Sequence, residues 1–432
     1  MGTDRWGRIV FGGITMFDGR WVHGVLAALV PLGLTAGSPG PPAPRAKPPV
    51  VLFPAFHFTK LLATVRGQTT APGCPRSGTF QDWFRNDRPT TFSQVCRDQL
   101  LTLRYRDDPS LPMATRFSEQ PGVTVEIMDY GRTDSAPYYE ALYRRLERAG
   151  YVRDRDLRVA GYDARLTPDM GGFLERTRRL IEDAYHDNGD RPVHLVGHSN
   201  GPLYAQYLLT HTSQAWRERY IHGFTPIAGN LPGQGLLYPL MFTGQNIQDF
   251  GYPTTRANAR SSARMYQSAP STYMSAADPA IFGDREVVIH DSSTGRSYTP
   301  RDYPRRFTDA GLRTAREIAA YYIGFVRFAG PRSFPNVDVY GEKGSGLPTV
   351  VGARLANLTT GQIADPGGFL RRDGDGNQED ITNNAILAWR AMRCHHFSLT
   401  DNPGVEHGAL PNDPALLDRL VTNLERPRTR CP

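Results

Sequence analysis

A serine between two glycines is the residue whose surroundings point most clearly to chemistry. Ser199 lies in the stretch Gly197-His-Ser-Asn-Gly201. The apolar run from Val193 to Val196 predicts a buried strand before it, and Pro202 to Leu209 has the character of a helix. A serine at a sharp turn between a strand and a helix is a nucleophile elbow, in which the glycines let the two elements approach closely. We therefore expect Ser199 to be a nucleophile rather than part of a structural turn.

An acid partner is expected in Arg372-Asp-Gly-Asp-Gly-Asn377. A serine nucleophile needs a histidine base, and the base needs a carboxylate that fixes its tautomer. In the α/β-hydrolase fold, which an elbow predicts, the acid and then the histidine follow the serine along the chain. Asp375 is our candidate because its flanking glycines would let it point into a cleft, and Asp373 is the rival. A solvated turn is the alternative, whereas the glutamate of an EF-hand calcium loop is absent.

The base is expected near the carboxyl end of the chain. His407 lies in Asn402-Pro-Gly-Val-Glu-His-Gly408, a predicted loop between the last strand and the final helix. His395 and His396 belong to the stretch Cys394 to Leu399, which we interpret as that last strand. A loop position at the end of a late strand favours His407 as the base, and the other two histidines are expected to be packing or surface residues.

Two backbone amides should stabilise the oxyanion of a tetrahedral intermediate. One is expected to be Asn200, which follows the nucleophile. The other should come from the loop after the first strand, predicted over Pro49 to Pro54, and our candidate is Phe56.

The composition predicts a large globular chain. With 432 residues, 39% of them hydrophobic, it can hold a hydrolase core and insertions. Its formal net charge of +7 predicts a basic surface. Weak attraction to anionic lipid is a sharper interpretation of that charge. No basic and aromatic motif indicates nucleic acid, and no cysteine or histidine spacing indicates zinc, so we expect neither nucleic acid, nor metal, nor cofactor.

The start of the chain resembles a targeting segment. Arg20 is followed by a mainly apolar stretch and small residues up to Gly37, which predicts a signal peptide, and a Pro-rich linker follows. The four cysteines suggest two disulfides, and the local pairs Cys74–Cys96 and Cys394–Cys431 are the simplest of three possibilities. Together these features predict a secreted, extracellular protein.

The order of the expected elements predicts an α/β-hydrolase with a mainly parallel central sheet. Strands are expected at 49–54, 123–130, 157–162, 193–196, 221–229 and 336–341, and helices at 136–150, 173–185 and 414–424. This organisation divides the chain into a signal-like segment and linker (1–47), a first part of the core (48–229) with an excursion (56–106), a cap or lid region (230–335) and a core completion (336–432).

Seven stretches carry a resemblance to a known family. They are Pro49-Val-Val-Leu-Phe-Pro54, Ala149-Gly-Tyr-Val-Arg-Asp154 through Tyr162-Asp-Ala-Arg165, Pro192 to Gly201, Gln214 to Phe224, Gly346-Leu-Pro-Thr349, Asp373-Gly-Asp-Gly376 and Pro403-Gly-Val-Glu-His407. In this order they resemble the lecithin:cholesterol acyltransferases and their lysosomal phospholipase relatives. The resemblance implies a Ser199, Asp375 and His407 triad and an oxyanion hole formed by the amides of Phe56 and Asn200.

The resemblance also implies an activity and a partner. The disulfide-stapled excursion would bind a phospholipid membrane or lipoprotein-like surface, and residues 230–279 would form the lid. An acyl group from a glycerophospholipid ester would pass through an acyl-enzyme to water or to an alcohol such as a sterol. A lysosome-like compartment is the alternative location for a eukaryotic chain. A general secreted esterase or triacylglycerol lipase and a non-catalytic lipid-binding protein are the alternative functions.

Several positions depart from the family pattern. Pro54-Ala55 stands where Pro-Gly is usual, and Asn377 replaces a threonine. The stretches Ala228 to Gly233 and Tyr162 to Arg165 both lack a usual tryptophan, and the second family disulfide does not map onto Cys394 and Cys431. These departures concern the acyl-chain pocket and the acceptor rather than the expected triad.

Overall fold

A computed structural model describes residues 47–67, 72–82, 91–244, 256–284, 286–327, 333–364 and 368–431. The chain divides into two units, Met1–Arg45 and Ala46–Pro432, and every described residue belongs to the second unit. The expected signal segment and nearly all of the linker therefore lie outside the described residues. Within them, no helix is both long and apolar enough to cross a membrane.

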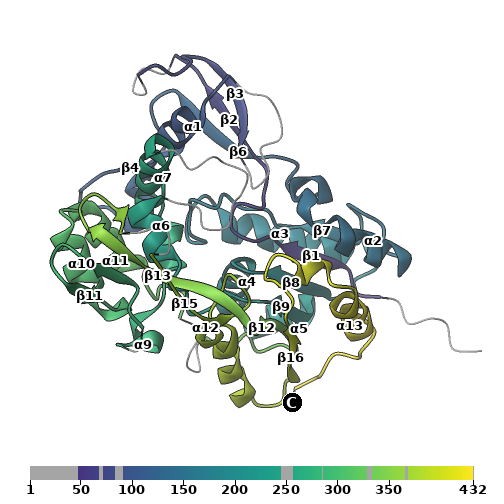
Figure 1. Ribbon diagram of the computed structural model, residues 1–432. Coiled ribbons are helices and arrows are strands. Elements are labelled where there is room, and N and C mark those ends of the chain that lie inside the picture. Colours follow the sequence, from purple (N-terminus) through teal and green to yellow (C-terminus); the bar gives the residue numbers. More distant parts are fainter. Residues whose placement is uncertain are drawn as a thin grey trace, which may run out of the picture. The chain divides into compact units, whose positions relative to one another are not determined.

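A six-stranded sheet forms the centre of this unit, in the order β16-β12-β9-β8-β1-β7 (Figure 1). Every neighbouring pair of its strands runs parallel. All residues of β1 and β8 are buried, as expected for central strands with helices on both faces. The mainly parallel sheet predicted from the sequence is confirmed. Its strands are β1 (Val50–Phe53), β7 (Leu157–Val159), β8 (Val193–His198), β9 (Ile221–Ile227), β12 (Val339–Ser345) and β16 (Phe397–Pro403).

Helices cover both faces of the central sheet. Val51 and Phe53 of β1 pack in one apolar cluster with α3, α4 and α5. Val50 and Leu52, which point to the opposite face, pack with α2 and α13. The chain thus has the predicted α/β-hydrolase fold. These helices are α2 (Glu140–Arg148), α3 (Phe173–His186), α4 (Gly201–Thr210), α5 (Gln214–Tyr220) and α13 (Pro414–Leu424).

The turn between β8 and α4 is as sharp as the sequence predicts. Ser199 has a left-handed backbone with φ of 58°, a strained conformation for a residue with a side chain. Its amide donates to the carbonyl of Ile227 on the next strand, with an N–O distance of 2.9 Å. A Cβ atom on Gly201 would lie only 2.1 Å from the carbonyl oxygen of Phe53. The start of α4 therefore lies directly against the end of β1.

The excursion is larger than the predicted range 56–106. The strand expected at 123–130 is β6, and it pairs with β2 in an antiparallel sheet of order β3-β2-β6, not with the core. The alternating burial of β2 and β6 fits a sheet with one covered face. A disulfide joins Cys74 to Cys96 on α1. The elements are β2 (Leu61–Val65), β3 (Gly78–Asp82), α1 (Gln94–Leu101), β4 (Arg104–Tyr105), β5 (Phe117–Ser118) and β6 (Val123–Ile127).

The cap region combines helices with a second sheet. The stretch 230–279, the expected lid, forms α6, α7 and α8 in its described part. Small residues permit close packing there, because a Cβ on Gly244 would lie 1.8 Å from the Ala259 carbonyl oxygen. The helices are α6 (Leu237–Thr243), α7 (Arg256–Ser268), α8 (Pro270–Met274), α9 (Pro279–Phe282), α10 (Tyr303–Asp309) and α11 (Arg313–Tyr322).

The second sheet corrects the predicted core completion at 336–432. Strands β13, β14 and β15 join β10 and β11 in the order β11-β10-β13-β14, with β15 paired to β13, so only β12 and β16 of this range complete the core. Pairing between distant segments leaves no local pattern in the sequence. The strands are β10 (Ile289–Asp291), β11 (Arg296–Tyr298), β13 (Leu347–Asn357), β14 (Gln362–Ile363) and β15 (Phe369–Gly374), and α12 (Asp380–Ala385) follows them.

The last core strand begins later than expected. We predicted it at Cys394 to Leu399, but Cys394 has φ of 75°, which a strand does not allow, and is bonded to Cys431. Strand β16 begins at Phe397, so His395 and His396 precede it. Both disulfides thus join the locally spaced cysteines.

Gly201→Ala tests the close packing of the elbow. The added methyl group would meet the Phe53 carbonyl, and such overpacking costs about 1–3 kcal/mol, so we expect a lower melting temperature. Gly229→Ala is the control, because the nearest atom to its added Cβ would be Pro202 Cβ at 3.2 Å. A melting temperature for Gly201→Ala equal to that of Gly229→Ala would contradict this packing.

Candidate active site

A cavity of about 530 Å³ lies at the carboxyl ends of the core strands. Ser199 after β8, His407 after β16 and Phe56 after β1 all line it. Its apolar wall comes partly from the cap, through α6 and α7, and its polar wall from the loops. The apolar residues are Ala55, Phe56, Phe58, Leu236, Leu237, Leu240, Tyr266 and Ala409, and the polar ones include Tyr138, Gln234, Asn377, Glu406 and Asn412.

Asp375 and His407 form a buried hydrogen-bonded pair. Asp375 Oδ2 lies 2.9 Å from His407 Nδ1, and the His407 amide donates to the Asp375 carbonyl at 2.8 Å. Asp375 is fully buried, and its Oδ1 accepts the amides of Asn377 at 3.0 Å and Gln378 at 2.7 Å. Burial raises the pKa of this carboxyl, but His407 and the two amides outweigh burial and hold the pKa below its usual value. Asp375 is therefore ionised at neutral pH.

The free nitrogen of His407 is left available. Because Nδ1 faces an ionised carboxylate, the proton of the neutral imidazole belongs on Nδ1, and Nε2 is an acceptor. Nε2 is buried and has no hydrogen-bond partner within the described part of the chain. Ser199 lines the same cavity, and the hydrogen bond between a nucleophile and its base is often long before substrate binds. Ser199 and His407 thus line one cavity, and Asp375 is buried against His407.

The two expected oxyanion donors follow the first core strand and the nucleophile. Phe56 follows Ala55, whose own amide is occupied by a hydrogen bond of 2.8 Å to the hydroxyl of Tyr139. Asn200 is the first residue after the nucleophile and the N-cap of α4. Among the described residues, neither the Phe56 nor the Asn200 amide donates a backbone hydrogen bond. Their role as oxyanion donors stays a prediction.

The rival candidates lie elsewhere. Asp373 is on β15 opposite Pro348 with an exposed side chain. His395 Nδ1 lies 3.7 Å from Asp338 Oδ1, and the His396 amide donates to the same carboxylate. These histidines precede β16, at the opposite end of the strand from His407. The described residues contain no group of three or more acidic, histidine or cysteine side chains that could hold a metal ion.

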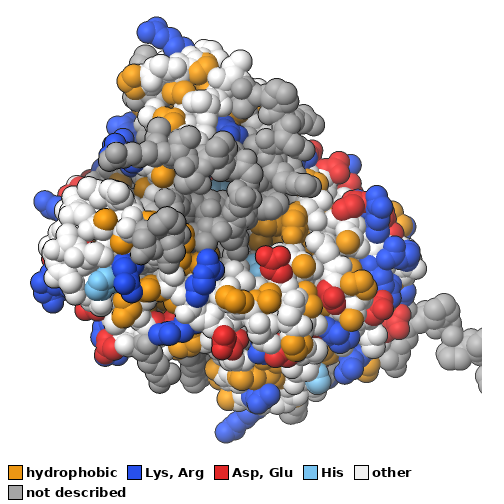
Figure 2. All heavy atoms as spheres, viewed as in Figure 1, with side chains coloured by type: hydrophobic (Ala, Val, Ile, Leu, Met, Phe, Trp, Pro, Cys, Tyr) orange, Lys and Arg blue, Asp and Glu red, His pale blue; other side chains and the backbone are white. Residues whose placement is uncertain are grey.

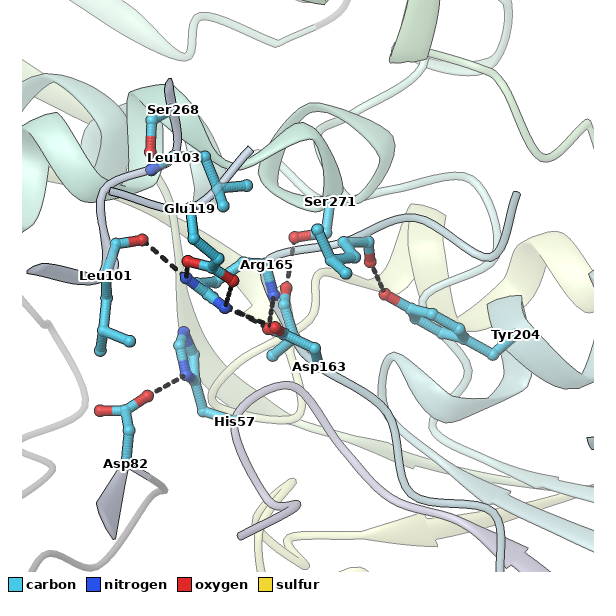
Figure 3. Close-up of polar contacts among 12 residues, drawn as sticks. His57, Asp82, Leu101, Leu103, Glu119, Asp163, Arg165, Tyr204, Ser268 and Ser271 are labelled. Atoms are coloured by element: carbon cyan, nitrogen blue, oxygen red, sulfur yellow. Dashed lines mark hydrogen bonds and ion pairs between the residues drawn. The ribbon is translucent and has the colours of Figure 1, made fainter. Parts of the chain in front are cut away.

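A buried arginine joins the excursion to the core (Figure 3). Arg165 donates to the carboxylates of Glu119 and Asp163, both at 2.6 Å, and to the carbonyl of Leu101 at 2.9 Å. Its side chain is only 1% exposed, so the two carboxylates are needed to compensate its charge. Glu119 and Leu101 belong to the excursion, and Asp163 follows β7. Arg165 therefore fixes the excursion on the core, a role that no local pattern indicated.

The excursion and the cap both meet the turn that carries Phe56. The Phe56 ring stacks on Tyr266 of α7, with a centroid distance of 6.4 Å. The next residue, His57, lies with Nδ1 3.8 Å from Asp82 Oδ2 at the end of β3 (Figure 3). The core turn that carries Phe56 and His57 is thus contacted by Tyr266 of the cap and by Asp82 of the excursion.

Comparison with known proteins gives the family. The family described as lecithin:cholesterol acyltransferase matches residues 108–325. Phosphatidylcholine-sterol acyltransferase of Gallus gallus is 28% identical over 307 residues, 68% of this chain and 70% of that protein. The human lysosomal phospholipase A and acyltransferase is 27% identical over 401 residues, 89% and 92% of the two chains. The chain belongs to the lecithin:cholesterol acyltransferase family. Two of the departures of this family member, Ala55 and Asn377, lie on the cavity wall.

A buried acid, Glu379, lies in the loop that follows Asp375, and no pattern in the sequence indicated it. Glu379 Oε1 accepts the Gly235 amide at 2.7 Å, and its Oε2 has no partner among the described residues. Burial, with smaller contributions from Glu286 and Asp375, raises the pKa of Glu379 to about 8. A neutral Glu379 thus links the cap segment at Gly235 to the loop that carries Asp375. Only the three-dimensional packing reveals this burial.

Glu379→Gln should stabilise the protein at alkaline pH. Because the pKa of Glu379 is raised from 4.5 to about 8 by folding, the folded state binds more protons between these values, and its stability falls as pH rises through them. Gln carries no charge and keeps an acceptor for Gly235. We expect the melting temperature of the variant, relative to the native chain, to rise from pH 4.5 to pH 8. A difference that does not change with pH would contradict the buried neutral acid.

Proposed function

We propose that the chain is a serine-dependent lipid acyl hydrolase and O-acyltransferase that acts on glycerophospholipid esters. The observation that carries the proposal is the buried Asp375–His407 pair. The Nε2 atom of His407 has no partner among the described residues, and His407 lines the same cavity as Ser199 at the elbow. Membership of the family adds the substrate class, since the relatives are named for acyl transfer from phosphatidylcholine and for phospholipase activity.

In the first half-reaction the acyl group moves to the enzyme. Ser199 Oγ attacks the ester carbonyl carbon while His407 Nε2 takes the hydroxyl proton, and Asp375 stabilises the imidazolium. The amides of Phe56 and Asn200 hold the oxyanion of the tetrahedral intermediate. The intermediate then breaks its bond to the glycerol oxygen, which takes the proton from His407. A lysophospholipid leaves, and the acyl chain lies along the apolar wall of the cavity.

In the second half-reaction an acceptor removes the acyl group. Water or an alcohol such as a sterol gives its proton to His407 and attacks the acyl carbon, and Ser199 leaves with that proton. Water yields a fatty acid and alcohol yields a new ester, so the same residues serve both outcomes. Access of the two acceptors to the cavity decides between them.

The expected partner is a phospholipid membrane or lipoprotein-like surface. Hydrophobic side chains show in small groups on one face, including the lobe of β2, β3 and β6, and Lys and Arg are spread around its edge (Figure 2). The membrane-binding role of the excursion stays a proposal, and its residues Trp83 and Phe84 lie outside the described part. Two disulfides and the relatives' names support a secreted or lysosome-like location.

Ser199→Ala and Asp375→Asn test the catalytic residues. Loss of the nucleophile should abolish ester hydrolysis, and loss of the acid should lower kcat by about 10⁴-fold because the imidazole takes the wrong tautomer. A fluorophosphonate probe should label Ser199 in the native chain. Asp373→Asn is the matched control, since this aspartate lies two residues away with an exposed side chain, and it should keep native activity. Ester hydrolysis retained by Ser199→Ala would contradict the proposal.

The substrate class is tested by comparing phosphatidylcholine vesicles with soluble p-nitrophenyl esters. We expect a higher rate on vesicles, with labelled acyl chains found as fatty acid and, when sterol is added, partly as sterol ester. The readout is product analysis with labelled phospholipid, and Ser199→Ala sets the background. Equal or better turnover of soluble esters, with no phospholipid cleavage, would instead assign a general esterase.

A further inference from the structure

A tyrosine and a histidine connect the two loops that carry the site. The Ala55 amide donates to the Tyr139 hydroxyl at 2.8 Å, and that hydroxyl lies 3.0 Å from His198 Nδ1. His198 Nε2 lies 3.1 Å from the carbonyl oxygen of His407. Tyr139 and His198 are both fully buried. Neither belongs to the expected triad, and the reaction described above does not use them.

The direction of each hydrogen bond follows from the groups at the two ends. Because the Tyr139 oxygen accepts the Ala55 N–H, its own proton is available to His198 Nδ1. The proton of neutral His198 is then on Nε2, where it is donated to the His407 carbonyl. Burial, and secondly His407, lower the pKa of His198 to about 3, so the imidazole is neutral at working pH. One tautomer satisfies all three bonds.

The two ends of this series of hydrogen bonds, Ala55 and His407, lie next to groups whose position matters for catalysis. Ala55 directly precedes Phe56, which lines the cavity. His407 is held through its backbone carbonyl, and its ring lies against His198 with a centroid distance of 5.1 Å. Tyr138, the neighbour of Tyr139, donates to the carbonyl of Gly408 at 2.5 Å. The short helix of Pro137–Tyr139 therefore bonds the histidine loop directly at the Gly408 carbonyl and, through His198, at the His407 carbonyl.

We propose that Tyr139 and His198 are positioning residues that set the base and the oxyanion loop relative to each other. The inference rests on the proposed function and adds to it. A hydrogen-bonded chain of fixed length joins Ala55 to His407, so the Phe56 amide and the His407 imidazole keep one separation across Ser199. Misplacement of a catalytic group by about 1 Å can cost about 100-fold in rate.

The test compares Tyr139→Phe and His198→Leu with His198→Gln and a matched control. Tyr139→Phe removes one hydroxyl and leaves the ring, whereas His198→Gln keeps a side-chain donor for the His407 carbonyl. The control is Tyr143→Phe, since Tyr143 is also fully buried and donates to the Ala136 carbonyl at 2.9 Å, outside this chain. Each variant is measured for kcat and KM on a soluble ester, for labelling rate by fluorophosphonate, and for melting temperature.

We expect kcat and the labelling rate to fall about 10- to 100-fold in Tyr139→Phe and His198→Leu, with KM little changed. The double variant Tyr139→Phe/His198→Leu should be no slower than the slower single variant, because both substitutions interrupt the same series of hydrogen bonds. His198→Gln should recover most of kcat. The melting temperature of Tyr143→Phe should fall by about as much as that of Tyr139→Phe, whereas its kcat should stay native.

A purely structural role predicts a different result. If Tyr139→Phe and His198→Leu lose melting temperature but keep the kcat of Tyr143→Phe, the inference is overturned. If His198→Leu does not fold, Tyr139→Phe alone decides. Failure of this inference can be told from failure of the proposed function by comparing the native protein with Ser199→Ala. If native activity is lost in Ser199→Ala, the proposed function stands whatever the Tyr139 and His198 variants do.

Discussion

The buried contact between Asp375 and His407 is the interaction on which the rest of the site depends. Asp375 follows β15 of the second sheet, and His407 follows β16 of the core. A carboxylate and an imidazole can be buried together only if their remaining polar atoms are satisfied, which the amides of Asn377 and Gln378 do for Asp375. Asp375 can therefore reach His407 only when the second sheet is packed against the core. The proposed catalysis thus requires the cap to be folded.

The same requirement for compensation explains how the other parts are attached. Arg165 is buried between Glu119 and Asp163 and so fixes the excursion beside the turn of Phe56. Glu379 stays neutral and joins the Gly235 segment to the acid loop. Tyr139 and His198 connect the Ala55 turn to the histidine loop. Each of these buried polar groups connects two segments that are distant in the sequence.

The sequence predicted the features that leave a local pattern. Strand β8, the elbow glycines and helix α13 are read from short runs, and the order serine, acid, histidine narrowed the partners to two loops. The pairing of β6 with β2, and that of β13 with β10, depends on segments that come together only in space. Tyr139 and His198 are separated by 59 residues and His198 and His407 by 209, so no spacing rule could associate them.

The central claim is that Ser199 carries the acyl group between phospholipid and acceptor. The most direct measurement is to quench the enzyme in acid during turnover of phosphatidylcholine with a defined acyl chain, and to map the mass of its peptides. One peptide should be heavier by the mass of that acyl group, with the modification on Ser199. An acyl group found on another residue, or turnover at full rate with no acylated peptide, would contradict it.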